Sequence, residues 1–218
     1  MENSNTQPYR IIEKEAAGEL TEKKSRFICR LCPVASEEEA IGIIEQEKKT
    51  YWDARHHCHA FILGEGSEIM RYGDDGEPSG TAGRPMLEVL KGAELTNCLA
   101  VVTRYFGGTL LGTGGLVRAY SGAVQAALEN ASPVWMCPGI SLSVLCDYQS
   151  SEKIKYQLMQ KYNMSPADTV YDAAVTLIYT APAGILESLQ KTIADLTAGK
   201  AVVTVLGETR YPSETRPD

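Results

Sequence analysis

The chain has 218 residues, enough for one large domain or two small domains that each bury a core. Its formal charge of −7 argues against a protein that coats nucleic acid by bulk electrostatics, although a local basic groove is compatible with it. No stretch approaches the roughly 20 apolar residues of a membrane span, and the N-terminal segment lacks the pattern of a signal peptide. Six irregularly spaced cysteines favour reduced thiols, so we expect a cytoplasmic protein without membrane contact.

The first half of the sequence alternates strand patterns with helix patterns. Ser36 begins the first helix, because Glu39 follows at the position that completes a capping box. Pro85 favours the start of a second helix, and Gly92 favours its end. Strands are predicted at residues 9–13, 25–34, 57–63, 68–72 and 99–103, and helices at residues 36–49, 84–92 and 116–128.

The pattern changes after Pro133 and Pro138, which mark the expected domain boundary. We therefore predict an N-terminal domain over residues 1–136 and a second domain over residues 137–218. In the second domain the order of predicted elements is βαββαβ, typical of a ferredoxin-like domain, so the fold class is α+β. Its strands are predicted at residues 140–146, 168–172, 175–179 and 201–206, its helices at residues 150–162 (capped by Ser150 or Ser151) and 183–196, and a loose tail at residues 208–218.

Residues 99–128 form the most distinctive stretch, a buried strand followed by a glycine-dense loop and an apolar helix. In this arrangement backbone N–H groups and the helix dipole can receive an anion, and glycine lets a ligand approach the backbone. Two nucleotide-binding motifs do not fit. Thr113 and Gly114 stand where a P-loop needs Lys and Ser or Thr, and Val117 stands where a dinucleotide fingerprint needs its third glycine.

Arg104 and Arg118 lie on either side of the glycines, and no acidic residue occurs between Glu94 and Glu129. We place Arg118 in the first turn of the helix, where the macrodipole disfavours a cation. It is therefore expected to pair with a carboxylate or with a bound anion, and the sequence leaves both possibilities open. The anion would bind at the amide-rich turn over residues 112–116.

The segment from Asp74 to Arg84 is too polar, and too rich in glycine and proline, to belong to the core. Its carboxylates and hydroxyls could hold magnesium, but the spacing is not that of an EF-hand. The favoured interpretation is a rigid loop whose acids pair with Arg84, Arg104 or Arg118. Because these opposite charges need partners, we expect this loop beside the glycine loop, where the two form one polar cleft.

The three histidines of the chain are His56, His57 and His59, with Cys58 among them. Along a strand His57 and His59 share one face, while His56 and Cys58 take the other. A zinc site with the C-x-x-C pair earlier in the chain is disfavoured, since thiols three residues apart on a strand face opposite sides. We favour histidines at a domain face or cleft, where they can act as acid or base. We expect neither a metal nor a cofactor.

Two long motifs carry a resemblance to a known family. Residues 71–83 (RYGDDGEPSGTAG), followed by Arg84 and Pro85, and residues 101–121 (VVTRYFGGTLLGTGGLVRAYS) resemble signatures of the bacterial, YigZ-like branch of the IMPACT family. The segments SRFIC and HHCHAF also match in position. The resemblance implies an N-terminal domain similar to a fold of a small-subunit ribosomal protein and of domain four of elongation factor G. It also implies a C-terminal domain similar to the ferredoxin-like fifth domain of that factor.

The same resemblance guides the expected function. Eukaryotic relatives regulate translation, so we expect a translation-associated regulatory or binding protein that contacts RNA, the ribosome or a translation factor through the polar cleft. The alternative is a hydrolase-type enzyme that acts on a small anionic or phosphorylated substrate in the same cleft. The resemblance of both domains favours the first, and the density of polar residues in the two loops keeps the second open. The sequence carries no signal for the oligomeric state. The expected binding residues are His57, His59, Asp74, Asp75, Glu77, Ser79, Thr81, Arg84, Arg104, Gly107, Gly108, Gly112, Gly114, Gly115 and Arg118.

Overall fold

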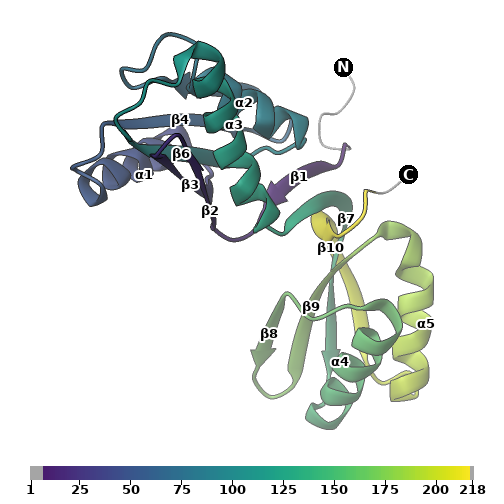
Figure 1. Cartoon of the computed structure of the whole chain (residues 1–218). Helices are drawn as coiled ribbons and strands as arrows, with labels where there is room; N and C mark the ends of the chain where they lie inside the picture. The colour runs from purple at the N-terminus through teal and green to yellow at the C-terminus, as the bar shows by residue number, and fades with distance from the viewer. Residues whose placement is uncertain (1–6, 217–218) are drawn as a thin grey trace. The chain divides into compact units, whose positions relative to one another are not determined.

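The computed structural model describes residues 7–216, which divide into two compact units. The first unit comprises residues 9–135, and the second comprises residues 136–216 together with residues 7–8. Figure 1 follows the chain through both units from its purple to its yellow end. We describe each unit by itself.

The first unit is built on a sheet with the strand order β2-β3-β6-β4-β5, in which every pair of neighbours is antiparallel. The strands are β2 (Ala16–Glu22), β3 (Ser25–Pro33), β4 (His56–Leu63), β5 (Ile69–Gly73) and β6 (Cys98–Tyr105). The central strand β6 is almost wholly buried, as its continuous apolar sequence indicates. The strand β2 was not predicted from the sequence, because this edge strand is largely exposed and carries few apolar residues.

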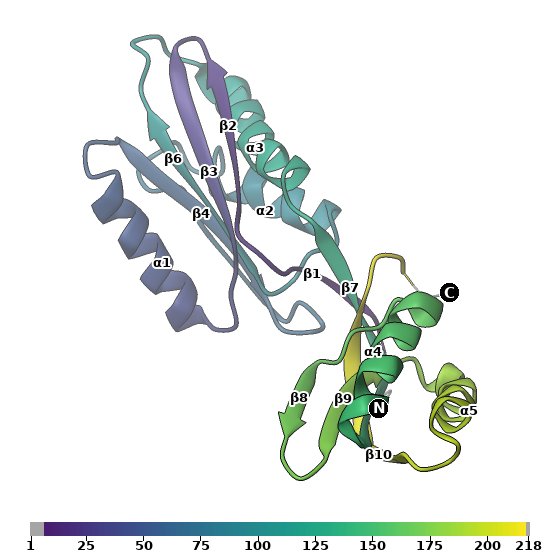
Figure 2. The same ribbon diagram turned by 90° about the horizontal axis from the view of Figure 1, so that it is seen from below.

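Helices cover both faces of this sheet. Figure 2 shows α1 (Glu37–Thr50) on one face, with α2 (Gly83–Gly92) and α3 (Gly112–Glu129) on the other. Because side chains alternate along a strand, each face contributes to its own core. Ala40 and Ile44 of α1 pack with Val101, whereas Met86 of α2 and Tyr120 of α3 lie in the larger core on the opposite face.

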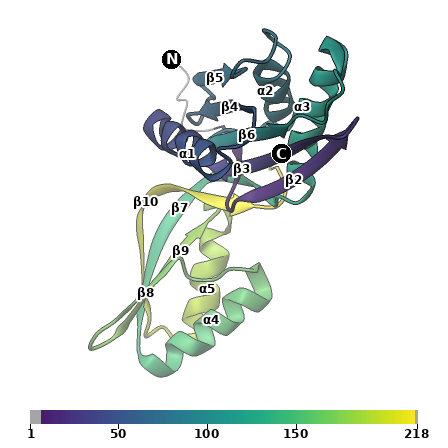
Figure 3. The ribbon, with the colours of Figure 1, turned by 60° about the vertical axis from the view of Figure 1, so that its left-hand side comes forward.

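The second unit has the predicted order βαββαβ, which confirms the two-domain α+β fold class. Its strands follow the order β10-β7-β9-β8, and both helices lie on one face of the sheet (Figure 3). Leu142, Ile154, Leu177 and Leu189 are fully buried in the core between them. The elements are β7 (Pro133–Cys146), α4 (Tyr148–Tyr162), β8 (Asp168–Tyr171), β9 (Val175–Ala181), the short helix η2 (Ala183–Ile185), α5 (Leu186–Thr197) and β10 (Val202–Ser213). The strand β1 (Tyr9–Ile12) also pairs with β7, along which the chain passes from one unit to the other.

Three boundaries in the second unit differ from the prediction. The strand expected from residue 140 begins at Pro133 as β7, so Pro133 and Pro138 lie within it. The helix α4 is capped by Asp147 and not by Ser150 or Ser151, because the Asp147 carboxylate accepts a hydrogen bond from the Ser150 N–H at 2.7 Å. The predicted loose tail is wrong as far as Ser213, since β10 continues to that residue as a polar strand.

The six cysteines are free thiols and all are buried. Within residues 7–216, no helix has the length and apolar character that crossing a membrane requires.

Candidate functional site

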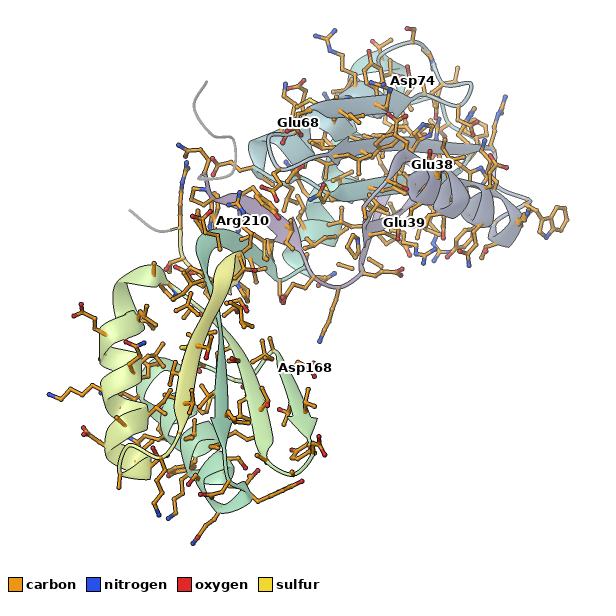
Figure 4. All side chains as sticks on the ribbon, turned by 180° about the vertical axis from the view of Figure 1, so that it is seen from behind. Glu38, Glu39, Glu68, Asp74, Asp168 and Arg210 are labelled. Carbon is orange, nitrogen blue, oxygen red and sulfur yellow. The ribbon has the colours of Figure 1, made fainter. Side chains whose placement is uncertain are left out.

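The acidic loop between β5 and α2 is organised by the carboxylate of Asp74, labelled in Figure 4. Its two oxygens accept hydrogen bonds from the N–H groups of Gly80 at 2.7 Å, Ala82 at 3.1 Å and Gly83 at 2.8 Å. The helix α2 begins at Gly83, and Ala82 at its N-cap position offers no side-chain acceptor. Asp74 therefore caps α2 from within the loop. The expectation that this carboxylate pairs with an arginine is wrong, because backbone amides occupy it.

Glu77 joins the same loop to the sheet and to α3. It is buried, and its Oε1 accepts hydrogen bonds from the Tyr120 hydroxyl at 2.8 Å and from Arg104 Nη1. His56 Nε2 lies 3.9 Å from the same oxygen. The acidic loop and the start of the glycine segment thus lie side by side, and Glu77 forms the link between them.

Arg104 does not have the role that its sequence position suggests. The side chain is buried against Phe27, whose ring centre lies 5.3 Å from Arg104 Cζ, and its charge is neutralised by Glu77. A buried guanidinium that already has a carboxylate partner is not free to neutralise phosphate. We therefore correct the expectation that Arg104 faces a ligand as an available cation.

Burial determines the protonation of two further groups beside Glu77. It raises the pKa of Tyr120 and the pKa of Cys58 far above their ordinary values. Tyr120 therefore keeps the proton that it donates to Glu77. Cys58 stays a thiol and donates to the Asp74 carbonyl at 3.0 Å, so it is not a thiolate nucleophile.

The sheet separates the predicted histidines from this cluster. Across β4 and β6, His56 pairs with Arg104 and His57 with Thr103, so His57 and His59 lie on the opposite face, toward α1. The Asp75 carboxylate belongs to that second group, since it accepts from the His57 N–H at 2.7 Å and lies 3.9 Å from Lys48 Nζ. Burial lowers the pKa of His59 below its ordinary value. The predicted set is thus divided between two faces and does not line one cleft.

The remaining residues of the acidic loop differ in exposure. The Thr81 hydroxyl is buried and donates to the Pro78 carbonyl at 2.6 Å, whereas Ser79 is exposed. Arg84 lies exposed in the first turn of α2. Among the residues that the structure describes, neither Arg84 nor Arg118 forms an ion pair or a side-chain hydrogen bond.

The glycine loop between β6 and α3 packs closely on another turn. A Cβ added at Gly107 would lie 2.1 Å from the backbone carbon of Lys24, so only glycine fits there. Gly108 and Gly112 adopt left-handed conformations, with φ of 83° and 70°. The helix α3 begins at Gly112, which places Arg118 in its second turn and corrects the predicted first-turn position. The guanidinium reaches back toward the helix start, since Arg118 Nη1 lies 3.7 Å from the Cβ position of Gly114, and Gly115 follows in the same turn.

Sequence reasoning missed a basic and aromatic surface at this end of the sheet, formed by Lys23, Lys24, Arg55 and Phe106. We call it the sheet-end surface. Arg55 Cζ and Arg104 Cζ each lie 5.6 Å from the centre of the Phe106 ring, so the ring contacts two guanidinium groups. Lys23 and Lys24 form the two-residue turn between β2 and β3, which packs on Gly107. The two consecutive lysines were the feature of the sequence that could have revealed this surface, because a two-residue turn ordinarily prefers Asn-Gly.

Fold and site together define a two-domain α+β protein with a ferredoxin-like second unit and a basic, aromatic end on the sheet of its first unit. Residues 23–128 match the Impact N-terminal domain, and residues 144–200 match DUF1949, a domain of unknown function. The chain is 37% identical to the IMPACT family member YigZ of Escherichia coli (strain K12) over 188 residues, which cover 85% of this chain and 92% of the relative. The chain belongs to the IMPACT family.

Two further matches agree with this. The IMPACT family member YvyE of Bacillus subtilis (strain 168) is 44% identical over 152 residues, 70% of each chain. The solved crystal structure of a hypothetical protein matches 92% of this chain and 98% of its own, with 34% identity and a TM-score of 0.59.

Proposed function

We propose that this protein is a translation-associated binding protein whose sheet-end surface contacts single-stranded RNA. The observation that carries the proposal is the exposed ring of Phe106 next to Arg55, beside the Lys23–Lys24 turn. The link to translation comes from the family, whose eukaryotic members are expected to be regulators of translation.

The chemistry of this surface suits RNA. Cationic side chains neutralise phosphates, and an exposed aromatic ring offers a platform on which an unpaired base stacks. The Phe106 side chain is 40% exposed, and Trp52, in the turn that precedes Arg55, is 81% exposed. Within residues 7–216, Lys23, Lys24 and Arg55 are exposed cations without a carboxylate partner. A local surface of this kind is compatible with the negative charge of the whole chain.

The turn between β2 and β3 adds a second argument. Lys23 and Lys24 have φ values of 45° and 66°, a left-handed conformation that costs a non-glycine residue roughly 1–2 kcal/mol. Asn and Gly would adopt this turn at lower cost. Lysine at both positions breaks a local preference, which is characteristic of functional sites.

The contacts of the acidic loop favour a binding protein over the enzymatic alternative. Asp74 is occupied by three amides and Glu77 by Arg104 and Tyr120, so both carboxylates serve the structure of the loop. Neither is aimed at an open substrate position as a general base requires.

Fluorescence anisotropy with a labelled single-stranded RNA of mixed sequence, repeated over a series of salt concentrations, tests the proposal. Replacing Lys23 and Lys24 by Glu should weaken binding and lower the salt slope by about 2, because two phosphate contacts are lost. Phe106→Ala should weaken binding by the ~1–3 kcal/mol of one stacked base with little change in salt slope.

A matched control separates the surface from net charge. Lys153 and Lys191 are exposed in the second unit, and replacing both by Glu changes the charge by the same amount. This control should bind RNA nearly as the parent protein does. Equal losses in the control and in the Lys23/Lys24 variant, or no binding by the parent protein, would overturn the proposal.

A further inference from the structure

A groove of about 760 Å³ runs between α2 and α3, on a different part of the first unit from the sheet-end surface. Its lining includes residues from both helices, among them Arg84, Val89, Gly92, Val117, Ser121 and Leu128. The groove is open to solvent, and apolar side chains dominate its walls. Of its lining residues only Gly80 takes part in the contacts described above, through its N–H to Asp74.

The composition of α3 shows that the groove is more than a gap between helices. Arg118 and Glu129 are the only charged residues among its 18. One side of the helix, with Tyr120, packs on the sheet, and a second side contacts β2, where a Cβ on Gly122 would lie 3.1 Å from Leu20. The third side carries Val117, Ser121, Gln125 and Leu128 and faces the groove, so apolar and uncharged polar side chains share it. A helix with so few charged residues ordinarily has most of its surface covered.

The helix α2 shows the same excess of apolar surface. Met86 and Leu90 are fully buried on the side that faces the sheet. Pro85 and Val89 lie on another side and line the groove. Both walls of the groove therefore expose apolar side chains that the core of the first unit does not bury, with polar side chains between them.

We propose that this groove binds an amphipathic helix of a partner protein, with acidic residues on the flank of that helix that meets Arg84 and Arg118. From Val117 to Leu128 the wall rises by about 16 Å, or about three helical turns. That length suits a helix whose apolar residues recur at spacings of three and four. The small residues Gly92 and Ser121 allow the partner's backbone to approach closely.

The charges around the groove select an acidic partner. Within residues 7–216, Arg84 and Arg118 have no carboxylate partner, and both are exposed on the helices that form the walls. Glu88 also lines the groove, but Lys91 neutralises it at 3.2 Å. Arg84 and Arg118 are then the charges left without a partner on these two helices beside the groove, on a chain whose total charge is negative. RNA suits this groove less well, because its lining contains no aromatic platform and is mostly apolar.

A designed peptide tests the inference directly. The probe is a fluorescein-labelled peptide of about 15 residues, with Leu at helical spacing and Glu on both flanks. Two further peptides serve as references, one with Lys in place of Glu and one with a central proline that breaks the helix. The Glu peptide should bind the full-length protein at least about tenfold more tightly than either reference, measured by anisotropy.

Three variants assign that binding to the groove. Ser121→Arg places a bulky charge on the groove floor and should weaken binding about tenfold or more, whereas Ser132→Arg, at an exposed position after α3, should not. Arg84 is exposed, and Arg84→Glu should reverse the preference between the two peptides, so that the Lys peptide binds more tightly than the Glu peptide. Thermal melts establish that each variant is folded.

Several outcomes would overturn the inference. They are equal binding of all three peptides, unchanged binding by Ser121→Arg, or a preference that Arg84→Glu does not alter. Loss of RNA binding in Ser121→Arg, with peptide binding retained, would assign the groove to nucleic acid instead. Because the sheet-end variants leave the groove intact, failure of the RNA proposal does not affect this test.

Discussion

Glu77 links three elements of the first unit through a single carboxylate oxygen. Arg104 from β6 and Tyr120 from α3 both donate to it, and His56 from β4 lies nearby. His56 in turn donates from Nδ1 to the Asp75 carbonyl at 2.8 Å, which fixes the position of its ring. A charge buried in this way is stable only as long as its partner remains.

Removing one member of the Glu77–Arg104 pair should therefore cost more than removing both. We expect Glu77→Leu or Arg104→Met to lower the free energy of unfolding by about 3–5 kcal/mol, since each leaves a buried charge unpaired. The double variant should lose less than either single variant. Urea denaturation of the four proteins measures the coupling. Single losses that simply add in the double variant would show that the two side chains do not depend on one another.

At the level of elements, the turn between β2 and β3 is the clearest conflict between local preference and structure. Its two lysines hold left-handed conformations, and the turn packs so closely on the glycine loop that Gly107 cannot carry a side chain. The loop that leads into α3 and the turn that begins β3 therefore depend on each other, although they lie far apart in the sequence.

Relieving this conflict should stabilise the protein and weaken its proposed RNA binding. Replacing Lys23 by Asn and Lys24 by Gly supplies the residues that a two-residue turn prefers, and we expect unfolding to become less favourable by roughly 1 kcal/mol. The same change removes two cations from the sheet-end surface. Thermal melts and RNA anisotropy on one sample measure both effects. A variant that is more stable and still binds RNA as the parent does would show that the lysines are not needed for RNA binding.

At the level of the whole molecule, the two units have separate hydrophobic cores. The core of the second unit contains Leu177, and the larger core of the first unit contains Leu90, both fully buried. Each core is made of residues from its own unit. Each unit therefore has its own hydrophobic core, which is the main requirement for folding independently.

Matched substitutions in the two cores should act on different unfolding transitions. Leu177→Ala and Leu90→Ala should each destabilise by about 2–5 kcal/mol, because each leaves a cavity in a close-packed core. In differential scanning calorimetry we expect each substitution to lower the midpoint of one transition and leave the other in place. One common transition that both substitutions shift equally would show that the units unfold together.

The elements that follow local rules could be predicted from the sequence. Ser36 caps α1 by accepting from the Glu39 N–H at 3.1 Å, as predicted. The Glu39 carboxylate accepts from the Ala35 N–H at 2.7 Å, one residue before the N–H that a capping box uses. The order of elements in the second unit followed from periodicity and turn residues, because β9 and the end of β7 alternate in burial against the same helical layer.

What the sequence could not decide was which strands became neighbours. Side-chain alternation assigns His57 and Arg104 each to one face of its own strand. Only the position of β6 between β3 and β4 brings Phe27, Arg104 and His56 into line across the sheet. That register buries Arg104 against Glu77, directs His57 to the opposite face and leaves Arg55 beside Phe106. Neighbours across a sheet are fixed by long-range pairing and by burial of both faces, and these act between segments whose separation along the chain carries no local signal.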